Sequence, residues 1–104
     1  MEAENLRSFL MSAVGYARAQ GHRKVSIVYW NQGGLFLFPC MRCGVIVDSV
    51  EGFHTFLPKK KEERAFVYFL CDRCRQKAFK DPKIFEEIED QLILSRAVAR
   101  KIKV

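Results

Sequence analysis

Four cysteines, arranged as two C-x2-C pairs, constrain this chain more than any other feature of its sequence. Cys40 and Cys43 form the first pair and Cys71 and Cys74 the second, with 27 residues between the pairs. One metal ion held by both pairs would tie two distant segments of a 104-residue chain to the same point. Paired thiolates at this spacing are typical of a closed, tetrahedral Zn²⁺ site. We therefore predict one structural Zn²⁺ ion with these four cysteines as its ligands.

Disulfides, iron and redox chemistry are the alternative uses of four cysteines. The chain starts Met1-Glu2-Ala3-Glu4, which lacks the basic residues and the apolar stretch of a secretory signal. We therefore expect a cytoplasmic, reducing location, in which disulfides are rare. A thioredoxin-like redox site needs one C-x2-C motif on a βαβ unit, whereas this chain has two widely separated motifs. These points favour zinc.

The composition is that of one globular domain, with 49% hydrophobic and 29% charged residues. No stretch reaches the roughly 18–20 apolar residues of a membrane-spanning helix, so we expect no membrane partner. We predict a single zinc-binding domain over residues 1–104 with an α+β fold, in which helices flank a small antiparallel sheet. Most of the nine phenylalanines are expected in its core, including Phe36, Phe38, Phe66 and Phe69.

Residue patterning predicts where the helices and strands lie. Apolar residues at helical spacing indicate a helix over residues 4–20, and β-branched and aromatic runs around a Gly-Gly turn indicate a hairpin over 24–38. A second hairpin is expected from strands at 45–50 and 53–57, followed by a strand over 65–70 and a short helix over 71–79. Asp81 and Pro82 are typical of a helix start, so the longest helix is expected over 82–102.

The surroundings of the two cysteine pairs resemble a known zinc module over residues 40–79. Cys40-Met-Arg-Cys43-Gly44 has the form of a zinc knuckle, and the second pair ends a predicted strand and opens a predicted helix. This order resembles the treble-clef zinc finger; a zinc ribbon, in which both pairs lie in hairpin turns, is the alternative.

A local likeness extends the comparison. Tyr68-Phe-Leu-Cys71-Asp-Arg-Cys74 is similar to the second knuckle of the zinc-binding domain that precedes the ATPase of the Clp protease unfoldase. The likeness covers residues 40–44 and 68–75 and implies a dimerising module that binds peptides or adaptors. The phosphate loop of an ATPase does not occur in the sequence.

The sequence contains no pattern that indicates catalysis. A zinc ion with four cysteine ligands has no free position for a reacting water molecule. His54 is isolated on a predicted strand and His22 follows the first helix, where we expect it to be solvated. The acidic residues of the last helix spread over a face that solvent can reach. We therefore predict that the protein is not an enzyme.

An excess of basic residues suggests an anionic partner. The formal net charge is +6 at pH 7. If residues 73–80 are helical, three of their basic side chains share one face, and the aromatic Trp30 offers a stacking surface. The first functional hypothesis is thus a nucleic-acid-associated or transcription-regulatory module, although these cations can also simply be solvated or offset the metal–thiolate charge. The candidate contacts are Arg73, Arg75, Lys77, Lys80 and the loop residues Lys59, Lys60 and Lys61.

The predicted C-terminal helix supports a second hypothesis. Its apolar residues recur at heptad spacing and form one stripe. Such a stripe can pair two copies into a homodimer or fill a groove of a larger protein, which would make this chain a protein-interaction adaptor or inhibitor. Packing on the first helix within one monomer is the alternative. The stripe includes Phe85, Ile88, Leu92, Ala99 and Ile102.

Overall fold

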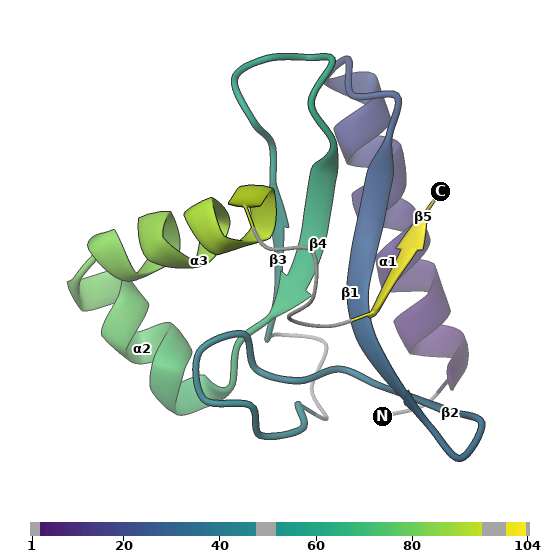
Figure 1. Cartoon of the computed structure of the whole chain (residues 1–104). Helices are drawn as coiled ribbons and strands as arrows, with labels where there is room; N and C mark the ends of the chain where they lie inside the picture. The colour runs from purple at the N-terminus through teal and green to yellow at the C-terminus, as the bar shows by residue number, and fades with distance from the viewer. Residues whose placement is uncertain (1–2, 48–51, 95–99, 104) are drawn as a thin grey trace.

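A computed structural model describes residues 3–47, 52–94 and 100–103 of the chain. Among these residues it contains three helices and five strands, which confirms the α+β fold (Figure 1). None of the described helices combines the length and the apolar character needed to cross a membrane. The order of elements is α1 (Ala3–Ala19), β1 (Val25–Gln32), β2 (Leu35–Leu37), β3 (Phe53–Phe56), β4 (Ala65–Phe69), α2 (Asp72–Lys80), α3 (Lys83–Leu94) and β5 (Arg100–Lys103).

The sheet is built around β1. It contains parallel and antiparallel pairs, so the prediction of an antiparallel sheet is wrong in this respect. β1 runs parallel to β4, with Val25 opposite Ala65 and Ile27 opposite Val67. Its other edge pairs antiparallel with β5 and, further along, with β2. β3 lies antiparallel to β4 at the far side. Because β1 and β4 are parallel, the loops that precede them meet at the same end of the sheet, where both strands begin.

The two terminal helices lie on opposite faces of the sheet, not against each other. Phe9 of α1 contacts Phe53 of β3, with tilted rings whose centroids are 6.0 Å apart. The next residue, His54, points to the other face and contacts Phe85 of α3 at 5.2 Å. On that face the Tyr68 hydroxyl donates a hydrogen bond to a Glu89 carboxylate oxygen, at 3.4 Å. The core therefore consists of the sheet residues together with the helix residues that pack on each face.

Several predicted elements are confirmed, and the second hairpin is wrong. The helices expected at 4–20 and 71–79, the hairpin at 24–38 and the strand at 65–70 correspond to α1, α2, β1–β2 and β4. β3 pairs with β4 instead of with residues 45–50. Within that stretch Ile46 forms an isolated bridge with Pro39, and residues 48–50 lie outside the described part. The apolar run at 45–47 therefore extends the first cysteine turn.

The predicted helix over 82–102 is confirmed as far as Leu94 and is wrong at residues 100–102, which lie in a strand. Residues 95–99, including Ala99, lie outside the described residues, and Ile102 lies in β5, opposite Ile27 of β1. The open edge of β1 supplies backbone partners for residues 100–103, which outweighs their helix propensity. Ile88 and Leu92 of α3 are each only 3% exposed because they pack on this chain's own sheet. They are core residues and are not available to a partner.

Burial of individual side chains follows the prediction in part. Phe38, Phe66 and Phe69 are buried as expected, whereas Phe36 is exposed on the β1–β2 hairpin. His22, expected in solvent, is fully buried and donates from Nδ1 to the carbonyl oxygen of Glu63, at 3.0 Å. It thereby joins the end of α1 to the loop before β4.

The packing of α3 predicts a pH-dependent effect at Glu89. Burial raises the pKa of this carboxyl; the Tyr68 hydroxyl bond opposes the shift, and the nearby Asp90 and Glu86 add to it. A raised pKa in the folded state means that stability falls as the pH rises through the usual glutamate range. We expect Glu89→Gln, whose amide oxygen still accepts from Tyr68, to raise the Tm at pH 7 by no more than a few degrees.

Calorimetry at neutral and acidic pH measures this effect. The gain should vanish below about pH 4, where the wild-type carboxyl is protonated in the folded and unfolded states. Glu87→Gln, on the exposed side of α3, is the control and should give no pH-dependent gain. An equal change in Tm at both pH values for Glu89→Gln would contradict the assignment.

Candidate metal centre

The first cysteine pair lies in a tight turn that follows β2. The Cys40 amide donates to the Val45 carbonyl at 2.7 Å, and the Gly44 amide donates to the Cys40 carbonyl at 2.9 Å. Gly44 has a φ of +84°, a conformation that glycine adopts without strain. The turn buries Cys40 and leaves Cys43 exposed. This geometry agrees with the knuckle predicted from the C-x2-C-G motif.

The second pair opens helix α2. Cys71 is the residue before the helix, with extended backbone angles, and Cys74 is buried in the first turn. The Arg75 amide donates to the Cys71 carbonyl at 2.8 Å, which starts the helical hydrogen bonding. Free backbone N–H groups at a helix N-terminus stabilise thiolates nearby.

Strand β4 brings the two pairs together. The Met41 amide donates to the Phe69 carbonyl at 2.9 Å, and Cys40 forms a bridge with Phe69. The ring of Phe38, just before the turn, packs on the Phe69 ring with centroids 4.7 Å apart. Because β4 leads directly into Cys71, docking the first turn on its last residue sets the two pairs side by side.

The four sulfur atoms form one compact cluster. All four Sγ atoms of Cys40, Cys43, Cys71 and Cys74 lie within 4.8 Å of one another, and those of Cys43 and Cys71 are 3.7 Å apart. Sulfurs bound tetrahedrally to zinc at about 2.3 Å would be about 3.8 Å apart. Within the described part of the chain, no other group of three or more His, Cys, Asp or Glu side chains has metal-ligand spacing. The cluster is therefore suited to hold one metal ion.

The surroundings of the sulfurs shift the pKa values of the cysteines in different directions. Burial raises the pKa of Cys40, but amide groups of Cys71, Cys43 and Arg42 donate to its sulfur and bring the pKa down to about 7. Burial, followed by the neighbouring cysteine side chains, raises the pKa of Cys74 to about 12. A bound cation would favour all four thiolates and release their protons.

His54 is not part of this cluster. Its ring stacks on Tyr68 with centroids 5.6 Å apart and contacts Phe79 and Phe85 on the α3 face of the sheet. Burial, and then the charge of Arg75, lower the pKa of its imidazole. His54 is thus a half-buried strand residue in an aromatic cluster, and within the described residues it is not among the metal-binding group.

The structure separates the predicted basic residues into two groups. Arg73, Lys77 and Lys80 are exposed on one side of α2, next to the buried face that carries Cys74 and Ala78. We call these three residues the α2 face. Arg75, on the same helix, is half-buried and pairs with Asp72 at 3.1 Å.

The lysines of the loop do not join the α2 face. Lys59, Lys60 and Lys61 precede β4, whereas α2 follows it, so the two groups lie at opposite ends of this strand (Figure 1). A five-residue strand separates them by about 13 Å. The basic residues named as candidate contacts therefore lie on two separate surfaces.

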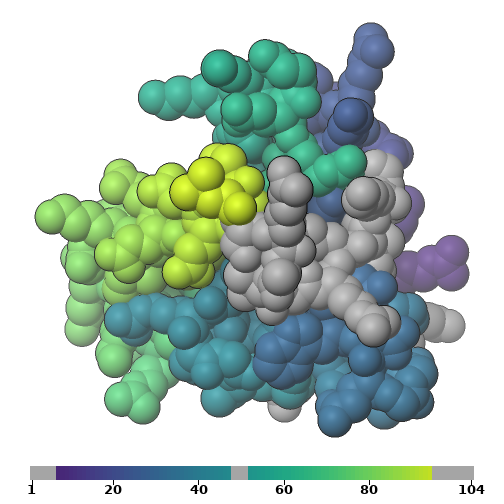
Figure 2. Space-filling model, in the orientation of Figure 1, coloured from purple at the N-terminus to yellow at the C-terminus, as the bar shows by residue number. Residues whose placement is uncertain are grey.

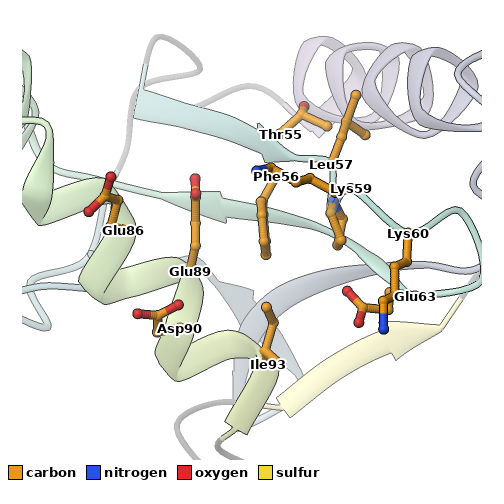
Figure 3. A pocket seen from close by; sticks show the side chains of 11 residues that line it. Thr55, Phe56, Leu57, Lys59, Lys60, Glu63, Glu86, Glu89, Asp90 and Ile93 are labelled. Atoms are coloured by element: carbon orange, nitrogen blue, oxygen red, sulfur yellow. The ribbon is translucent and has the colours of Figure 1, made fainter.

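Two features were missed by sequence reasoning. Leu35 and Phe36 are 66% and 56% exposed, in addition to the 38% exposed Trp30 already considered for stacking, on a hairpin that has no charged residue between Val25 and Cys40. The absence of charged residues between Val25 and Cys40 was the sequence signal that could have indicated this exposed apolar hairpin. The other feature is a hollow of about 630 Å³ between α3 and the loop before β4 (Figure 3). Its lining includes Phe56, Lys59, Lys60, Glu86, Glu89, Asp90 and Ile93.

Comparison with models of protein families, with curated proteins and with solved structures finds no match to this chain. The likeness of residues 40–44 and 68–75 to the Clp unfoldase zinc domain therefore stays local. What the structure establishes is a set of four cysteines positioned to bind a metal ion.

Removing one ligand should release the metal and destabilise the fold. We expect Cys40→Ser to abolish stoichiometric metal binding and to lower the Tm. A metal at 1,000 times its Kd contributes about 4 kcal/mol to folding, which corresponds to a Tm change of about 15–30 °C in a domain of this size. Elemental analysis and thermal melts measure both effects.

Met41→Leu is the matched control, because Met41 is buried beside Cys40 and is not a ligand. It should retain the metal and lose little stability. A metal-free wild-type protein with the same Tm as the metal-treated protein would contradict a structural role for the cluster.

Proposed function

We propose that this protein is a non-catalytic, zinc-stabilised module that binds the phosphate backbone of nucleic acid. Zinc is favoured because four thiolates in a closed shell match its preferred ligands and geometry. A knuckle at Cys40, the β3–β4 hairpin and the helix that starts after Cys71 follow one another in the treble-clef order. This order supports a treble-clef zinc finger over a zinc ribbon.

The observation that carries the nucleic-acid proposal is the exposed α2 face. Three cations line one side of a helix whose first turn belongs to the metal centre. Binding of Zn²⁺ by four thiolates adds a charge of −2, so the formal charge falls from +6 to about +4. The remaining excess still favours a polyanion. Contacts from Arg73, Lys77 and Lys80 to phosphates would not read the base sequence.

The α2 face predicts a strong salt dependence of binding. Each phosphate contact changes the slope of log K against log salt by about 0.9 for duplex DNA. We expect Arg73→Ala with Lys77→Ala to weaken binding and to make the slope about 2 units shallower. Fluorescence anisotropy with a labelled 20-bp duplex at 50–200 mM salt measures both quantities.

Arg7→Glu is the control for net charge, because Arg7 is exposed near the start of α1 and its reversal also removes two positive charges. It should bind DNA with nearly the wild-type slope. Metal content should be unchanged in both proteins. The same affinity and slope in wild type and the α2 variant would rule out the α2 face as the binding surface.

The exposed hairpin favours a second candidate, a protein-interaction adaptor. Trp30 and Leu35 are exposed on one face of the hairpin and Phe36 on the other, and this uncharged apolar tip has the character of surfaces that often mark protein interfaces. Phe36→Lys should then abolish complexes that survive nuclease treatment during purification from the native host, as identified by mass spectrometry. Leu94→Lys, which changes an 80% exposed apolar residue elsewhere, should leave them intact. Identical partners with both variants would exclude the hairpin.

A further inference from the structure

The parallel pairing of β1 with β4 creates a basic surface that is not contiguous in the sequence. The segments 20–24 and 57–64 precede these two strands and therefore meet at the same edge of the sheet. Figure 2 shows the two segments side by side at one end of the molecule. Together they carry six basic and two acidic residues. We call the six basic residues the basic edge: Arg23, Lys24, Lys59, Lys60, Lys61 and Arg64.

Polar contacts join the loop before β4 to the end of α1 and to β1. His22, fully buried at the end of α1, donates from Nδ1 to the carbonyl oxygen of Glu63 at 3.0 Å. The Arg64 guanidinium donates to the hydroxyl of the buried Ser26 at 3.2 Å, and Lys61 Nζ donates to the Gln20 carbonyl at 2.6 Å. The cations of the basic edge therefore project from a fixed frame.

A hollow of about 380 Å³ lies between the segments. It is lined by Gly21, Arg23, Lys24, Lys61 and Glu62. Arg23 and Lys24 are exposed, and the only ion pair found among the described residues is the one between Arg75 and Asp72. Lys59 and Lys60 also border the larger hollow of Figure 3, which has carboxylates of α3 on its opposite wall. Arg23 and Lys24 are thus the cations that best report on an anion bound in this hollow.

We propose that the basic edge is a second contact for a nucleic-acid phosphate backbone, so that one copy of the protein bridges two nucleic-acid segments. The choice of nucleic acid as the anion rests on the proposed function. The basic edge lies before β4 and the α2 face lies after it, at opposite ends of the sheet. The Cα trace extends over 32 × 31 × 23 Å, which sets the upper limit of the distance between the two surfaces.

Native mass spectrometry with a 10-bp DNA duplex tests this proposal, because it counts protein and DNA copies in each complex. The wild-type, zinc-loaded protein should bind two duplexes per copy at low salt. Arg23→Ala with Lys24→Ala should leave one duplex and weaken the second by about tenfold or more. Arg73→Ala with Lys77→Ala should also leave one duplex. Arg7→Glu, which removes the same charge, should keep two.

The outcomes separate this proposal from the proposed function. If the wild type binds one duplex, and only the α2 variant loses it, the basic edge is not a binding surface and the α2 proposal stands. If only the Arg23/Lys24 variant loses binding, the basic edge binds nucleic acid and the α2 face does not. Absence of any duplex on the wild-type protein would overturn both. Unchanged metal content in each variant shows that the altered binding is not caused by unfolding.

Discussion

The docking of the first cysteine turn on the end of β4 is the contact on which the candidate metal centre depends. One backbone hydrogen bond, from the Met41 amide to the Phe69 carbonyl, fixes the turn two residues before Cys71. The rings of Phe38 and Phe69 pack against each other beside this contact, with centroids 4.7 Å apart. Two segments that are 27 residues apart in the sequence are thereby held at one point. A metal ion bound there would stabilise the turn, the strand and helix α2 together.

The parallel alignment of β1 and β4 explains why the molecule has two basic surfaces. The loops that precede these strands lie at the same end of the sheet, with Arg23 and Lys24 beside Lys61. The metal cluster and α2 lie at the opposite end of β4. Basic residues thus lie at both ends of β4, and only the α2 face adjoins the metal cluster. This arrangement is the basis for proposing a protein that contacts two nucleic-acid segments.

Sequence reasoning was most successful where the signal was local. The C-x2-C spacing, the Gly44 turn and the strand that runs into Cys71 are each determined by neighbouring residues, and all were predicted. The pairing of β1 with β4 and with β5 depends on residues far apart, so the sheet order was not predictable from periodicity. The same limitation explains the error at Ile102, where an open strand edge outweighed a helical pattern. It also explains why His22 was expected in solvent.

X-ray absorption at the zinc edge of the purified protein tests the central claim most directly, because it reports the identity and distance of the atoms around the metal. The account predicts one zinc ion per chain with four sulfur neighbours at about 2.3 Å, and no nitrogen or oxygen ligand. The sulfurs belong to Cys40, Cys43, Cys71 and Cys74. A shell that includes nitrogen or oxygen, or a purified protein that binds no zinc, would contradict it.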